Sequence, residues 1–153
     1  MNLERLLRAI VLSVLGCSMF AVAQEKGNWH AANSTAQTIT GDIALADEKI
    51  SISFSAFPIA RIRTLQPSEV SAVFDTDDNA SPSGSLYKLS IPASKKFLRK
   101  NSLCGAEDTQ WMVTYVAERS LHLAFFSGQK APTLTPDAIV NSTDLCGIFS
   151  YTR

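Results

Sequence analysis

Residues 110–126 read QWMVTYVAERSLHLAFF, and the pattern of these residues is the clearest indication of the fold class of the chain. Its two runs, Gln110–Ala117 and Ser120–Phe126, are rich in the β-branched and aromatic residues that favour strands. Only Glu118 and Arg119 separate the runs, and so short a link indicates a hairpin of two antiparallel strands. We therefore expect this hairpin to be part of an antiparallel β-structure.

Strand signals continue along the chain on both sides of the hairpin. At Ile50–Phe54 every second residue is apolar, which predicts a half-buried strand. Phe57 and Pro58 are expected to end or bend that strand, because proline cannot donate a hydrogen bond to the ladder. Further runs predict strands at Ile59–Leu65, Val70–Phe74, Leu86–Ile91 and Leu145–Thr152.

One short helix is expected at Ser94–Lys100, where Ser94 can cap the first turn and Phe97 and Leu98 can pack against the protein. Sequential strands separated by turn signals are typical of small barrels and sandwiches. The sequence therefore predicts a mainly β protein: a small antiparallel β-barrel or sandwich of seven to eight strands with one short helix.

The chain begins with the features of a secretory signal. Two arginines precede the apolar run Ala9–Val22, and Ala21-Val22-Ala23 supplies the small residues of a cleavage site. We predict a signal peptide at residues 1–23 and a periplasmic or extracellular location. Alternatively, Val14-Leu15-Gly16-Cys17 resembles a bacterial lipobox, in which Cys17 would carry a lipid anchor.

Removal of the signal peptide leaves 130 of the 153 residues, enough for one domain with its own core. Residues 24–37 are mostly polar and are expected to form a flexible segment, followed by a single β-rich domain at 38–153. The chain has 14 basic and 14 acidic residues, so no global field draws it to nucleic acid. No second apolar run reaches the roughly 20 residues of a membrane helix, and we expect no transmembrane span in the mature protein.

Cysteine usage points to a disulfide. Of the three cysteines, only Cys104 and Cys146 remain after cleavage of the signal peptide. In an oxidising compartment this pair predicts a disulfide that closes a 43-residue loop, and two buried thiols are the alternative. A disulfide also removes both candidates for a nucleophilic thiolate.

Signals for catalysis and metal binding are weak. His30 lies in the polar segment, His122 lies in a predicted strand, and no G-x-S-x-G motif frames a serine. Asp75, Asp77 and Asn79 match only the first half of a calcium loop, whose glycine and glutamate positions hold other residues. We therefore predict no catalytic residue, no metal and no cofactor.

A dense basic patch is the first candidate for a binding site. It consists of Lys95, Lys96, Arg99 and Lys100. On a helix these residues would stack as two i,i+4 pairs of like charge, an arrangement that helix stability does not favour. The patch therefore predicts contact with an anionic partner, and a solvated basic face is the alternative.

Late aromatic residues are the second candidate. Trp111 and Tyr115 share one face of their predicted strand, as Phe149 and Tyr151 do of theirs. Core packing is the expected role of these four side chains. The alternative is a pocket for an apolar ligand inside a small barrel.

Two resemblances add to this reading. The segments Asn101–Gly105 (NSLCG), Leu145–Tyr151 (LCGIFSY) and Ile39–Ile43 (ITGDI) resemble small secreted bacterial proteins known only as uncharacterised sequences. More loosely, the expected architecture is similar to that of periplasmic lysozyme inhibitors, small β-barrels with a disulfide near the C-terminal end. The inhibitory motif of that family is not found here, so the likeness implies an architecture and no activity.

These features predict a secreted or periplasmic, non-enzymatic binding protein. It is expected to act on a macromolecule of the cell envelope or extracellular space, as an inhibitor or accessory factor. The main alternative is a barrel that carries a small apolar ligand, and a hydrolase with an unrecognised site comes third. A large internal cavity would favour the carrier, and a filled barrel with an exposed apolar or basic patch would favour the partner-binding protein.

Overall fold

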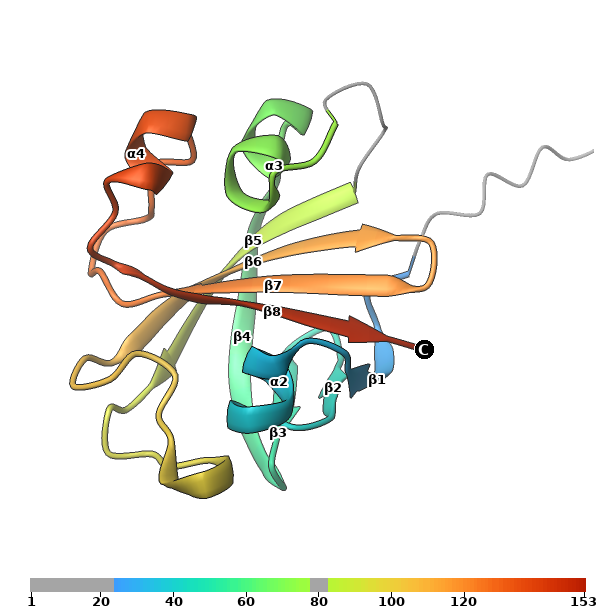
Figure 1. Ribbon diagram of the computed structural model, residues 1–153, viewed down its shortest axis with the longest axis vertical. Helices are drawn as coiled ribbons and strands as arrows, with labels where there is room; N and C mark the ends of the chain where they lie inside the picture. The colour runs from blue at the N-terminus through green and yellow to red at the C-terminus, as the bar shows by residue number, and fades with distance from the viewer. Residues whose placement is uncertain (1–23, 78–82) are drawn as a thin grey trace, which may run out of the picture.

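A computed structural model describes residues 24–77 and 83–153 of the chain. Within these ranges, eight antiparallel strands form a closed barrel in which each strand pairs with the next in sequence (Figure 1). Pairing of His30 in the first strand with Thr152 in the last closes the barrel. The fold class predicted from the sequence is therefore confirmed. The predicted signal peptide and Cys17 lie outside the described residues.

In the described ranges, the strands are connected by turns, three short α-helices and one 3-10 turn. Their bounds are β1 Gly27–Ala31, β2 Ile43–Leu45, β3 Lys49–Ile52, β4 Ser55–Thr64, β5 Ser83–Ile91, β6 Thr109–Ala117, β7 Ser120–Phe126 and β8 Leu145–Thr152. The helical elements are α2 Ser34–Ile39, α3 Pro67–Phe74, η1 Leu98–Lys100 and α4 Pro136–Val140.

The hairpin predicted at residues 110–126 is present as β6 and β7. Its strands pair from Trp111 opposite Phe126 to Ala117 opposite Ser120. Glu118 turns the chain with a left-handed φ of 53°. The strands predicted at Leu86–Ile91 and Leu145–Thr152 correspond to β5 and β8.

The predicted disulfide joins Cys104 to Cys146, with 4.9 Å between the Cα atoms. It ties the loop between η1 and β6 to the start of β8. This link staples two segments that are 42 residues apart. No helix in the described part of the chain is long and apolar enough to span a bilayer.

Two local strand predictions are wrong. Val70–Phe74 is helical, because Gln66 and Glu69 form a capping box and Pro67 begins α3. Pro58 does not interrupt a strand but lies inside β4, where the pairing of β4 passes from β3 to β5. At such a change of partner, the missing backbone donor of proline is tolerated.

The prediction of a flexible segment at residues 24–37 is also wrong. This segment contains β1 and most of α2, and Trp29 is completely buried in the barrel. The Arg153 guanidinium lies 4.3 Å from the centre of the Trp29 ring, and the indole nitrogen donates to the Glu25 carbonyl at 2.8 Å. The polar composition of the segment did not reveal the buried Trp29, whose ring packs against residues as distant in sequence as Arg153.

Large side chains fill the interior of the barrel. The following are all at most 1% exposed: Trp29, Ile50, Ile52, Ile91, Met112, Leu121, Leu123, Phe125, Phe149 and Tyr151. The buried Tyr151 hydroxyl lies 2.7 Å from Thr40 Oγ1, which satisfies both groups. A second apolar cluster, which includes residues of α3 and α4, packs on the outside of the barrel wall.

Candidate functional site

The aromatic pocket considered for Trp111, Tyr115, Phe149 and Tyr151 does not form. Tyr115 and Trp111 belong to the outer apolar cluster, whereas Phe149 and Tyr151 point into the barrel. The register explains the separation: Tyr115 is opposite His122, which is in turn opposite Ser150. Residues directly opposite share a face, so the neighbours of Ser150 in β8 must point to the other side.

Surface features gather instead at one end of the barrel, around a groove of about 760 Å³. The groove lies between β1, the α2–β2 connection, the β3–β4 turn and η1. We call this region the loop end and define it by Phe54 and the segment 95–100. Figure 1 shows the β3–β4 turn and η1 at the lower edge of the barrel, opposite α3 and α4.

Phe54 is the most exposed large apolar residue at the loop end, with a relative exposure of 110%. It occupies the two-residue turn between β3 and β4, where Ser53 and Phe54 have φ values of 48° and 65°. Hairpin turns with two left-handed residues favour Asn-Gly, because a Cβ is strained there. The Ser53 hydroxyl donates to the Thr40 carbonyl at 3.0 Å and holds the turn against the end of α2.

The helix predicted at Ser94–Lys100 is wrong, because only the three-residue η1 forms. Arg99 and Lys100 have left-handed φ values of 53° and 60°, which a continuous α-helix does not tolerate. Phe97 is buried and contacts the Phe57 ring edge-on, with 6.0 Å between the ring centres. Phe97 thus holds the loop to the core, and the amphipathic helix expected at Ser94–Lys100 does not form.

Leu98 lies across the groove from Phe54 and is 39% exposed. An added Cβ at Gly41, whose φ is 63°, would stand 3.0 Å from the Leu98 side chain, so glycine lets the two segments approach. The Asn101 amide donates to the Thr38 carbonyl at 3.3 Å and ties the loop to α2. These contacts set Leu98 beside the groove.

The predicted basic patch is carried by this loop and not by a helix. Lys96, Arg99 and Lys100 are exposed and Lys95 is half-buried. None of the four forms an ion pair with any residue in the described ranges. The loop end therefore combines two exposed apolar side chains with unpaired cations.

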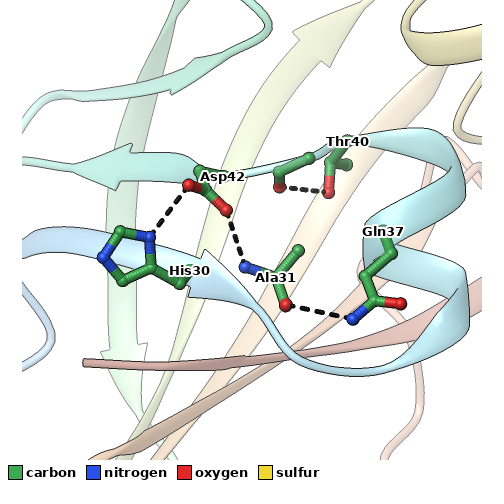
Figure 2. Close-up of polar contacts among 6 residues, drawn as sticks. His30, Ala31, Gln37, Thr40 and Asp42 are labelled. Atoms are coloured by element: carbon green, nitrogen blue, oxygen red, sulfur yellow. Dashed lines mark hydrogen bonds and ion pairs between the residues drawn. The ribbon is translucent and has the colours of Figure 1, made fainter.

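An acid–base pair lies beside the same groove. His30 Nδ1 lies 2.9 Å from one carboxylate oxygen of Asp42, whose other oxygen accepts from the Ala31 amide at 2.9 Å. Figure 2 shows both contacts as dashed lines. The bond from Ala31 and then the contact with His30 lower the pKa of Asp42 below its usual value. Both side chains are mostly exposed, so the pair shapes the rim of the groove rather than its interior.

A second surface cleft, of about 590 Å³, contains His122. His122 Nδ1 lies 2.9 Å from Ser150 Oγ, but the described part of the chain places no carboxylate in contact with the ring. The Ser150 amide donates to the side chain of Asn33, so it cannot serve an oxyanion. This arrangement does not support acyl transfer.

The calcium-loop match falls partly outside the description, since Asn79 lies in the segment 78–82. Within residues 24–77 and 83–153, no group of three or more metal-ligating side chains gathers. Asp75 ends α3 with a left-handed φ of 53°, a role in the backbone turn.

Comparison of the chain with known protein families, curated proteins and solved structures finds no significant match. A functional assignment therefore rests on the residues of this chain. Sequence reasoning placed Phe54 in a strand and missed it as a surface feature. The alternation of apolar residues from Ile50 continues through Phe54, so the sequence pattern does not reveal the turn at Ser53 and Phe54.

Proposed function

We propose that this is a secreted or periplasmic, non-enzymatic binding protein that docks a protein partner through its loop end, as an inhibitor or accessory factor. The observation that carries the proposal is Phe54, a fully exposed aromatic ring on a strained turn. Non-glycine residues in left-handed conformations cost about 1–3 kcal/mol each and cluster at ligand clamps and switch regions. The turn itself connects β3 to β4, but the exposed ring of Phe54 buries no surface against the described residues.

The chemistry of the loop end favours a protein as partner. A phenylalanine ring gains about 1.5–3 kcal/mol when it enters an apolar pocket, and aromatic side chains are frequent at the centres of interfaces. Arg99 and Lys100 follow Leu98 in the chain and form no ion pairs with described residues, so they are available to pair with carboxylates at the rim of such a pocket. A polyanion offers charge to these cations but no pocket for Phe54.

The packed interior argues against the carrier alternative. A carrier of a small apolar ligand needs an internal space of several hundred Å³. Here Trp29, Phe125, Phe149 and Tyr151 occupy the centre with at most 1% exposure.

The Cys104–Cys146 disulfide supports the proposed secreted or periplasmic location, because disulfides persist in oxidising compartments.

Affinity capture from the native envelope fraction, followed by mass spectrometry, tests the proposal. The processed protein is compared with its Phe54→Ser variant and with Val140→Ser, a matched control. Val140 is 84% exposed on α4, at the opposite end of the barrel (Figure 1). We expect one protein to be recovered with the wild type and the control, and to be lost with Phe54→Ser.

Two outcomes contradict the proposal. If Phe54→Ser recovers the same partner in full, the loop end does not dock it. If recovery needs Arg99 and Lys100 but not Phe54, the surface binds a polyanion rather than a protein pocket. Arg99→Ser and Lys100→Ser are therefore included in the comparison.

A further inference from the structure

The cleft around His122 has no role in the docking proposed above. It lies on the outer face of β6, β7 and β8, beside the end of α3. Its lining and that of the loop-end groove share no residue. At about 590 Å³, it falls within the range of small-ligand sites.

Three rings form one wall of this cleft. Tyr115 and His122 stack with 5.5 Å between their centres and 19° between their planes. Phe74, at the end of α3, packs 5.7 Å from Tyr115 and 6.0 Å from His122. Because the rings come from a helix and two paired strands, their positions are fixed by the fold rather than by a mobile loop.

The polar groups of the cleft leave several hydrogen-bonding positions unused. His122 Nδ1 is engaged by Ser150 at 2.9 Å, but no described residue bonds its other ring nitrogen. The Tyr115 hydroxyl likewise has no partner among residues 24–77 and 83–153. Burial of the imidazole lowers the pKa of His122, which favours the neutral form of the ring. Ser120 adds a hydroxyl to the lining.

The charged residues that line the cleft restrict the class of ligand it can bind. Among the described residues, the lining contains no lysine or arginine to bind an anion, and its one carboxylate, Glu118, is an exposed residue of the β6–β7 turn. What remains is an aromatic wall with neutral donors and acceptors. A sugar ring presents an apolar face together with a girdle of hydroxyl groups, which suits this combination.

We propose that the Phe74–Tyr115–His122 cleft binds a neutral sugar ring. The aromatic wall takes the apolar face of the pyranose, while the Tyr115 hydroxyl and the free nitrogen of His122 bond its hydroxyl groups. The binding is non-covalent, and Ser150 acts as the positioning residue that orients the imidazole.

Nuclear magnetic resonance titration of the processed protein tests this site with three probes: maltose, cellobiose and N,N′-diacetylchitobiose at millimolar concentration. We expect at least one probe to shift the resonances of Tyr115 and His122. Tyr115→Phe removes only a hydroxyl that has no protein partner, so the fold is retained while affinity falls about 5-fold. Phe54→Ser, at the loop end, is the matched control and should bind the sugar unchanged.

Several results would overturn the sugar site. No resonance shift with any of the three probes excludes it, as does equal sugar affinity of the wild type and Tyr115→Phe. If benzylamine shifts the same resonances and Glu118→Gln abolishes that shift while no sugar binds, the cleft takes cations instead. Because Phe54→Ser is scored separately, failure here leaves the docking proposal untouched.

Discussion

Replacement of Phe54 by glycine is expected to stabilise the free protein. The φ of 65° at Phe54 places a Cβ in the left-handed region, at a cost of about 1–2 kcal/mol. Glycine removes this strain but loses about 0.5–1 kcal/mol through the greater freedom of its unfolded chain. The side chain is fully exposed, so its removal sacrifices no burial. The net gain is therefore about 1 kcal/mol.

Phe54→Ala separates backbone strain from loss of the ring. Alanine keeps the Cβ and therefore the strain, so the free energy of unfolding should stay close to that of the wild type. Both variants lack the aromatic ring, and both should lose the docked partner. In Phe54→Gly, stability is thus expected to rise while partner binding falls. In Phe54→Ala, only partner binding is expected to fall.

Urea unfolding followed by tryptophan fluorescence measures the difference, because Trp29 is buried in the barrel. For a domain of this size, about 1 kcal/mol corresponds to a rise in melting temperature of roughly 3–5 °C. An unchanged or lower free energy of unfolding in Phe54→Gly would refute the reasoning. Equal stabilisation by alanine would show that the ring, and not the backbone, is the source of the strain.

Two further predictions concern stability. Replacing Cys104 and Cys146 together by serine should lower the free energy of unfolding by about 4 kcal/mol, because the bridge spans 42 positions of chain; an unaltered urea midpoint would contradict this. The pKa of Asp42 is lowered in the folded state, so its stabilisation is complete above about pH 4 and disappears as the pH falls below that. Between about pH 4 and pH 2, the Asp42→Asn variant should therefore lose less stability than the wild type, as measured by melting curves. An identical fall of melting temperature with pH in both proteins would count against the role of Asp42.

Local sequence patterns were sufficient to predict strands that pair with the neighbouring strand in the chain. The β6–β7 hairpin and β8 were predicted because alternation and turn length are properties of adjacent residues. The same reasoning failed at Val70–Phe74, where a capping box outweighed strand propensity. It also failed at Trp29, whose burial depends on the distant closure of β1 onto β8.

The candidate sites were predicted less well than the fold. The four cations of the basic patch were identified, but the helix expected to carry them does not form. With Phe97 buried, Arg99 and Lys100 adopt left-handed backbone conformations that end any helix. The two aromatic pairs were assigned correct faces within each strand, but only the register across β7 shows that these faces are opposite. The face of a strand on which a side chain lies follows from the local sequence. Its neighbours in space depend on how the strands pair.

Sequence alone was enough to predict a mainly β protein with a disulfide between Cys104 and Cys146. Composition, alternation and the count of cysteines express the local backbone preferences and pairing chemistry on which those features depend. The folded structure was needed to show that the barrel interior is full, that Phe54 lies across the groove from Leu98, and that Tyr115 stacks on His122. These relations arise from closure of the barrel, which brings together residues far apart in the chain and sets which side chains remain for a partner.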